Sequence, residues 1–130
     1  MKKLLVLLFS LLISFNSYGE WTLVASGSDS GSGSSEINHY VDFDRINKQG
    51  KDIYFWQLSD YKINEFGDSS HIGKVRGNCN SMGIQMQVVY FYSDSMGSGK
   101  LNATDNEPWD WEYYPPGSVM ESLLKSVCDH

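Results

Sequence analysis

The chain has 130 residues, with 16 acidic side chains against 10 basic ones and a net charge of −6 at pH 7. An acidic surface repels the phosphate backbone of nucleic acids, so we expect no nucleic acid partner and favour a basic one. The length fits one ordinary domain and leaves no room for a second.

Residues 1–19 have the pattern of a cleavable secretory signal. Two lysines precede an apolar stretch, and the small residues Ser17 and Gly19 stand three and one positions before a cut at Glu20. The apolar stretch is shorter than the roughly 20 residues that span a bilayer, which argues against a retained anchor. No cysteine near the cut could carry a lipid. We therefore expect a single exported domain at 20–130, periplasmic or extracellular and soluble.

The segments after Trp21 are rich in aromatic and β-branched residues, a pattern typical of short strands. Five strands are expected, at 21–26, 37–42, 51–61, 70–79 and 84–93. Polar connections are expected at 27–35, 43–50, 64–69 and 95–100. A sixth strand, interrupted along its length, is expected from 101–104 and 109–113.

Side chains alternate along a strand, so the expected third and fifth strands indicate what each packs against. On the third, Tyr54, Trp56 and Leu58 point to one side, and Ile53 and Phe55 to the other. Because both sides carry apolar bulk, we expect this strand near the centre of the sheet. The fifth strand has one unbroken apolar side, as in a sheet packed against another layer. That side consists of Ile84, Met86, Val88, Tyr90 and Tyr92.

A C-terminal helix is predicted more sharply than any strand. A proline- and glycine-containing stretch ends the sheet, and Ser118 followed by Glu121 forms a capping box. At about 100° per residue, the apolar side chains that follow lie on one half of the helix. They are Val119, Met120, Leu123, Leu124 and Val127, with Cys128 at the edge of that half.

Cys79 and Cys128 are the two cysteines of the chain. An even number of cysteines in a small exported domain usually forms a disulfide. Cys79 closes the expected fourth strand, so a bond to Cys128 ties the helix to the sheet. The alternative is a pair of buried free thiols.

Candidate catalytic and metal-binding residues do not assemble into a recognised motif. The nearest metal candidate, His39 with Asp42 and Asp44, is divided between two sides of a strand, and aspartates at a strand end usually bond the following backbone. His71 has serine neighbours but no nucleophile motif around it, so we expect it to be a partly exposed polar residue. We therefore expect no enzymatic activity, no metal and no cofactor.

The most unusual segment is 105–114, DNEPWDWEYY, in which aromatic residues alternate with acids. In a strand, Trp109, Trp111 and Tyr113 would project to one side. Aromatic faces stack on sugars and attract cations, and the acids add charge. The segment is therefore a candidate ligand platform, formed by Trp109, Asp110, Trp111, Glu112 and Tyr113. The alternative is that both tryptophans fill the core beneath the helix.

Several short motifs follow one another along the chain. They are Trp21, Tyr40-Val41-Asp42 followed by Ile46 and Gly50, WQLSDY at 56–61, Cys79 at a strand end, Trp109, and the ending from Pro116-Gly117-Ser118 to Val127-Cys128. In these motifs and their order the chain resembles the surface-adhesin protein E-like family of exported bacterial domains. The resemblance implies an α+β fold, in which an antiparallel sheet of about six strands carries one C-terminal helix on its concave face, tethered by the disulfide.

The same resemblance implies a non-enzymatic exported domain that binds a protein or an envelope component. Two other functions fit the sequence. Small size, acidic charge and a disulfide suit a periplasmic inhibitor of a lysozyme-like enzyme, and the acids of 105–112 suit a small sugar-active hydrolase. An open sheet also leaves strand edges unpaired, which allows a homodimer to form.

Overall fold

The computed structural model describes residues 20–28, 36–61 and 67–130, so the expected signal at 1–19 and most of the connection at 27–35 lie outside the described residues. The elements in chain order are β1 (Thr22–Ser28), β2 (Glu36–Val41), η2 (Phe43–Arg45), β3 (Asn47–Gln49), β4 (Asp52–Asp60), β5 (Ser70–Asn78), β6 (Gly83–Tyr92), η3 (Ser95–Gly97), β7 (Leu101–Asp105), β8 (Glu112–Tyr113) and α2 (Val119–Cys128). In the described part of the chain, no helix is both long and apolar enough to cross a membrane.

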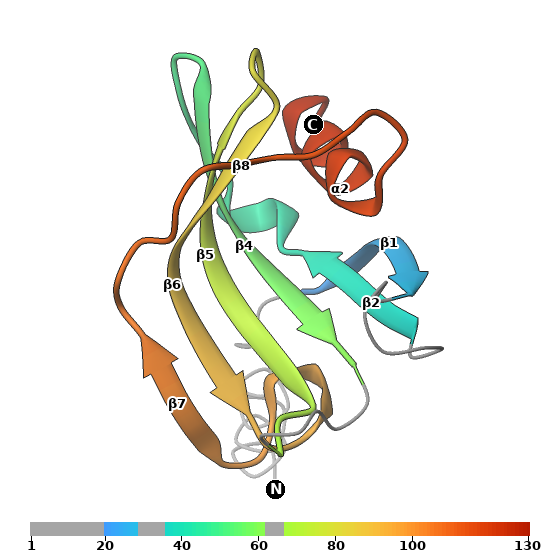
Figure 1. Cartoon of the computed structure of the whole chain (residues 1–130), viewed down its shortest axis with the longest axis vertical. Coiled ribbons are helices and arrows are strands. Elements are labelled where there is room, and N and C mark those ends of the chain that lie inside the picture. Colours follow the sequence, from blue (N-terminus) through green and yellow to red (C-terminus); the bar gives the residue numbers. More distant parts are fainter. Residues whose placement is uncertain (1–19, 29–35, 62–66) are drawn as a thin grey trace, which may run out of the picture.

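The strands form one antiparallel sheet whose main path runs β1-β2-β4-β5-β6-β7. The short strands β3 and β8 pair with β4 and β6. Strand β4 lies inside the sheet between β2 and β5, as its two apolar sides predict. Figure 1 shows the chain after β7 running along the edge of the sheet and then crossing its upper end to reach α2. The predicted α+β architecture is confirmed.

Helix α2 covers one side of the sheet, here called the helix face, because its apolar half is complementary to that side. Leu124 packs so closely on Gly77 that a Cβ atom there would lie 2.6 Å from Leu124 Cδ1. The predicted cap is present, since Ser118 Oγ accepts a hydrogen bond from the Glu121 amide. The buried residues of this core are Val41, Ile53, Phe55, Val75, Ile84, Leu123, Leu124 and Val127.

A disulfide joins Cys79, just after β5, to Cys128, the last residue of α2. The Cα atoms of the two residues are 5.9 Å apart, and 49 positions separate them in the sequence. The bond therefore closes a long loop and holds the end of the helix at one end of the sheet. The prediction of a helix tied to a sheet is confirmed.

One expectation about β6 is wrong. The strand has a bulge, because Lys74 pairs with Val88 while the adjacent Val75 pairs with Met86, which leaves Gln87 as an extra residue. An extra residue reverses the alternation of sides beyond it. Ile84 and Met86 therefore share the helix face with Val89 and Phe91. Val88, Tyr90 and Tyr92 lie on the opposite side of the sheet.

The polar connection expected at 43–50 also differs from the structure, because it contains the short helix η2 and the edge strand β3. Asp42 ends β2 as aspartates at strand ends usually do, since its Oδ1 accepts a hydrogen bond from the Asp44 amide at 3.1 Å. The remaining expected strand bounds agree with the structure to within about two residues, the usual scatter at strand ends.

Candidate functional site on the outer face of the sheet

The side of the sheet opposite the helix, here called the outer face, carries aromatic and cationic side chains. They come from alternate positions on three neighbouring strands, which place them on one side. Helix α2 does not cover these side chains. All of them are partly buried or exposed. The set consists of Tyr54 and Trp56 on β4, Lys74 and Arg76 on β5, and Tyr90 and Tyr92 on β6.

Arg76 organises one end of the outer face. Its Nη2 donates to Asp52 Oδ2 at 2.6 Å, and its Nε donates to the same oxygen at 3.2 Å. The guanidinium lies 5.9 Å from the ring centroid of Tyr54 and 5.2 Å from that of Trp111, within cation–π range. The hydrogen bonds from Arg76 lower the pKa of Asp52. Asp52 therefore remains ionised and fixes the guanidinium between the two rings.

A hollow of about 670 Å³ occupies the other half of the outer face. Its lining includes Trp21, Trp56, Tyr90 and Tyr92, and we call it the aromatic hollow. The rings of Trp56 and Tyr90 are inclined by only 24°, with centroids 6.4 Å apart. The volume lies within the range of about 300–1,000 Å³ that is usual for small-ligand sites.

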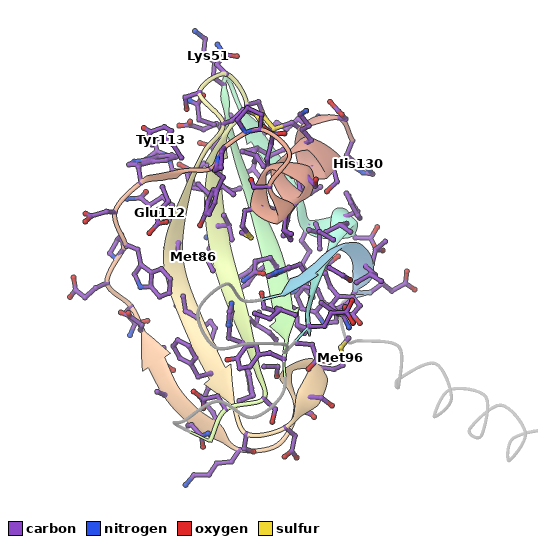
Figure 2. All side chains as sticks on the ribbon, turned by 45° about the vertical axis from the view of Figure 1, so that its right-hand side comes forward. Lys51, Met86, Met96, Glu112, Tyr113 and His130 are labelled. Atoms are coloured by element: carbon purple, nitrogen blue, oxygen red, sulfur yellow. A yellow bond between two sulfur atoms is a disulfide. The ribbon has the colours of Figure 1, made fainter. Side chains whose placement is uncertain are left out.

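The loop that contains η3 forms one wall of the aromatic hollow through Met96, Gly97 and Ser98. Gly97 lies directly on β5, because a Cβ atom there would be 2.6 Å from Ile72 Cδ1. The loop is held by its backbone, since the Gly97 amide donates to Ser70 Oγ at 2.9 Å. Figure 2 labels Met96 at this end of the molecule, with Tyr113 and Glu112 toward the other end.

Cationic side chains border the aromatic hollow. Arg45 lines it and also lines an adjoining hollow of about 360 Å³, which Lys74 shares. Arg45 is 60% exposed, and its Nε lies 3.4 Å from Oδ2 of the buried Asp42. Lys74 is exposed and has no hydrogen-bond or ion-pair partner within the described residues. One paired and one unpaired cation thus stand beside the aromatic rings.

The predicted platform lies at the edge of the sheet along β6. Trp109 is 42% exposed, its amide donates to the Met86 carbonyl, and its Nε1 donates to Asp105 Oδ2 at 2.9 Å. Trp111 and Tyr113 lie on the outer face, where both would contact a Cβ atom on Gly83. Tyr113 is 65% exposed. The alternative in which both tryptophans fill the core beneath the helix is wrong, since Tyr114 takes that place.

The expected strand at 109–113 is present only at its end, as β8 (Glu112–Tyr113). Pro108 has no N–H with which to continue the pairing to β6. The bulge at Gln87 lies opposite, between the parts of β6 that pair with β7 and with β8. The segment consequently leaves the regular ladder and presents Trp109 outward. Asp110 and Glu112 are exposed beside it.

The helix face contains a largely buried cluster of polar side chains, His39, Gln57 and Ser59, that is not predicted from the sequence. Ser59, only 2% exposed, donates to Gln57 Oε1 at 3.0 Å, so the 2.8 Å contact with His39 needs the Nδ1–H of His39 as donor. Gln57 Nε2 is buried with no hydrogen-bond partner in the described part of the chain. Burial lowers the pKa of His39, and burial together with the nearby His39 lowers that of His71 to about 4. Both imidazoles are thus neutral at pH 7.

His71 is partly buried between Tyr61 and Phe91, whose ring centroids lie 5.7 and 5.8 Å from its own. Its partial burial agrees with the sequence expectation. Within residues 20–28, 36–61 and 67–130, no group of three or more His, Cys, Asp or Glu side chains could hold a metal ion. His39 lies on the helix face and Asp42 lines the outer face, so those two are not brought together.

The aromatic hollow is not predicted from the sequence. Its rings come from Trp21, Trp56, Tyr90 and Tyr92, which are distant in the sequence. A usable signal was the recurrence of aromatic residues at alternate positions of the third and fifth expected strands. The bulge at Gln87 concealed it, because without the extra residue Tyr90 and Tyr92 are assigned to the same side as Ile84.

Comparisons with known proteins agree with this fold. The family model of surface-adhesin protein E matches residues 21–129. Among solved structures, the chain is similar to the crystal structure of protein E from non-typeable Haemophilus influenzae, with a TM-score of 0.52, 15% sequence identity and 86% of each chain covered. At that identity the likeness concerns the fold. Comparison with the curated proteins gives no match.

Proposed function

The chain belongs to the surface-adhesin protein E family, and on this premise we propose that it is a non-enzymatic, exported binding domain for a protein or an envelope component. It acts in the periplasm or outside the cell. The partner contacts the platform at the sheet edge, made up of Trp109, Asp110, Trp111, Glu112 and Tyr113. The observation that carries the proposal is the outward exposure of large aromatic rings in this acidic segment.

Exposed tryptophan and tyrosine are enriched at sites where proteins recognise one another. Trp109 and Tyr113 are among the most exposed large hydrophobic side chains of the described residues. The segment is also held in place, because Gln85 Nε2 donates to the Trp109 carbonyl and the Glu107 amide donates to Asp105 Oδ1. A partner therefore meets rings whose backbone is already ordered, which limits the entropy lost on binding.

The serine–histidine pair that the structure forms supports a non-enzymatic role. A nucleophilic serine needs a neighbouring base and access to substrate. Ser59 has His39 beside it, but its hydroxyl donates to Gln57 and the residue is 2% exposed. Substrate therefore has no approach to that oxygen.

Crosslinking in intact cells tests the proposal. A photo-crosslinking amino acid is placed at Trp109 or Tyr113 of the full chain, and captured material is identified by mass spectrometry. The control position is Ser122, which is exposed on α2, away from the platform. We expect one recurrent macromolecule from both platform positions and not from Ser122. Equal capture from all three positions, or none from the platform, would contradict the proposal.

A further inference from the structure

We propose that the aromatic hollow is a binding site for an acidic saccharide, a sugar that carries a carboxylate. The site is separate from the platform, and nothing in the proposed function assigns a ligand to it. Three properties of the hollow support this ligand class. They are its aromatic lining, the cations on its border and the buried carboxylate of Asp42 beside Arg45.

The lining suits the flat face of a sugar ring. Trp56 and Tyr90 present two nearly parallel rings, 6.4 Å apart between centroids, and Tyr92 adds a third on the same strand as Tyr90. The C–H groups of a pyranose pack against such rings, whose faces carry partial negative charge. All three aromatic residues are only partly buried, so their rings can be reached by a ligand.

The charges beside the hollow select an acidic sugar over a neutral one. Arg45 uses Nε toward Asp42 and keeps its other N–H donors, while Lys74 has no partner within the described residues. Among the residues that line the aromatic hollow and the adjoining hollow, Arg45 and Lys74 are cationic and Asp42 alone is acidic. A ligand carboxylate would form charge-assisted hydrogen bonds there.

The buried carboxylate of Asp42 helps to position Arg45. It is 2% exposed yet lines the hollow, and its Oδ1 already accepts from the Asp44 amide. Its Oδ2 lies 3.4 Å from Arg45 Nε, and this ion pair holds the guanidinium at the hollow that both residues line. The site thus has a preformed donor, which reduces the ordering that binding requires.

The test uses the exported protein recovered from cells that express the full chain. Binding of 3′-sialyllactose, glucuronic acid, lactose and glutamate is followed by saturation-transfer NMR and by tryptophan fluorescence. We expect saturable binding of one or both acidic sugars, and at least about tenfold weaker binding of lactose and of glutamate, which lack the carboxylate or the ring. The two acidic probes separate sialic acid from uronic acid as the source of the carboxylate.

Variants locate the site. Lys74→Ala changes an exposed side chain, and Trp56→Phe keeps a smaller ring, so both should fold. We expect each to weaken binding of the acidic sugar about tenfold, since Lys74→Ala removes a cation beside the hollow and Trp56→Phe reduces the ring area on which the sugar packs. Lys51→Ala is the matched control for Lys74→Ala, because it removes an exposed lysine from the turn before β4, outside both hollows and outside the platform, and it should bind as the unchanged protein does.

Three results would overturn the proposal. One is the absence of saturable binding of either acidic sugar up to about 10 mM. Another is binding that Lys74→Ala and Trp56→Phe leave unchanged. The third is equal affinity for lactose and 3′-sialyllactose, which would remove the requirement for a carboxylate. Absence of partner capture from Trp109 and Tyr113, with binding of the acidic sugar intact in the unchanged protein, would contradict the proposed function and leave this inference standing. Partner capture without sugar binding would do the reverse.

Discussion

The two faces of the central strand β4 experience different environments. On the helix face, Ile53 and Phe55 are 1% exposed beneath α2, which the disulfide holds in place. On the outer face, Tyr54 and Trp56 alternate with them in sequence but are only partly buried. One strand therefore contributes both to the core and to an accessible aromatic surface. Stability and binding can be altered separately by substitutions one residue apart.

Charged and titratable groups differ between the faces in the same way. The outer face carries three cations, Arg45, Lys74 and Arg76, of which Arg76 is held by hydrogen bonds to the carboxylate of Asp52. The helix face carries His39 and His71, whose pKa values are lowered chiefly by burial. Changes to the helix face should accordingly alter stability and its pH dependence, and changes to the outer face should alter recognition.

The largest expected effect comes from removing the disulfide. For two cysteines 49 positions apart, the chain-entropy model gives a loss of about 4 kcal/mol in the free energy of unfolding. Cys128→Ser in a Cys79→Ser background should show this loss in urea unfolding followed by circular dichroism. A loss below about 1 kcal/mol would mean that α2 is held by packing alone.

A somewhat smaller loss is expected from Leu124→Ala. The side chain is fully buried against Gly77, and a large-to-small change in a core costs about 2–5 kcal/mol. The neighbouring exposed Lys125→Ala is the matched control and should change the free energy of unfolding by less than about 0.5 kcal/mol. Similar losses for both variants in urea unfolding would show that the helix does not cover the sheet as described.

The success of the sequence predictions follows from how local each feature is. The helix, its Ser118 cap and the pairing of Cys79 with Cys128 depend on short-range patterns and on a count of two cysteines. Side-chain alternation placed β4 at the centre of the sheet for the same reason. These features specify the scaffold.

The features that sequence reasoning missed depend on neighbours that are distant along the chain. The bulge at Gln87 is one extra residue whose position is set by pairing with β5, and no local pattern marks it. The aromatic hollow needs Trp21, Trp56 and Tyr90 to meet from three strands. Composition identified the segment around Trp109 as unusual, but its departure from a regular strand depends on the bulge opposite Pro108.

An intermediate effect is expected from acidification, and it reports on the helix face. A histidine with a pKa lowered in the folded state binds fewer protons there than in the unfolded chain. Above about pH 6.5 the histidine is neutral in both the folded and the unfolded chain, so it does not alter the free energy of unfolding. As the pH falls from about 6.5 to about 4, the unfolded chain takes up protons first and stability declines, by about 1–3 kcal/mol for His71. Urea unfolding at several pH values measures this decline.

The control for acidification is His71→Phe, which keeps a ring between Tyr61 and Phe91 but does not titrate. We expect a flatter stability profile between pH 6.5 and 4, with the remaining slope due to His39. The carboxylates with lowered pKa values lose their stabilising contribution as the pH falls past their ordinary values, 3.8 for Asp52 and 4.5 for Glu121, so Glu121 adds to the slope only at the acidic end of this range. An unchanged slope in His71→Phe would show that this histidine is not the group responsible.

The smallest effect on stability is expected from Arg76→Ala on the outer face. The pair of Arg76 with Asp52 remains partly exposed, and such ion pairs contribute little to folding, so the free energy of unfolding in urea should fall by no more than about 1 kcal/mol. Trp111, however, loses the guanidinium that lies 5.2 Å from its ring, and its accessibility to iodide should rise. Arg76→Ala in a Trp111→Phe background supplies the reference, because the gain in quenching should vanish there. If the gain persists without Trp111, the guanidinium shields a different tryptophan, and the platform and the rest of the outer face are not joined through Arg76.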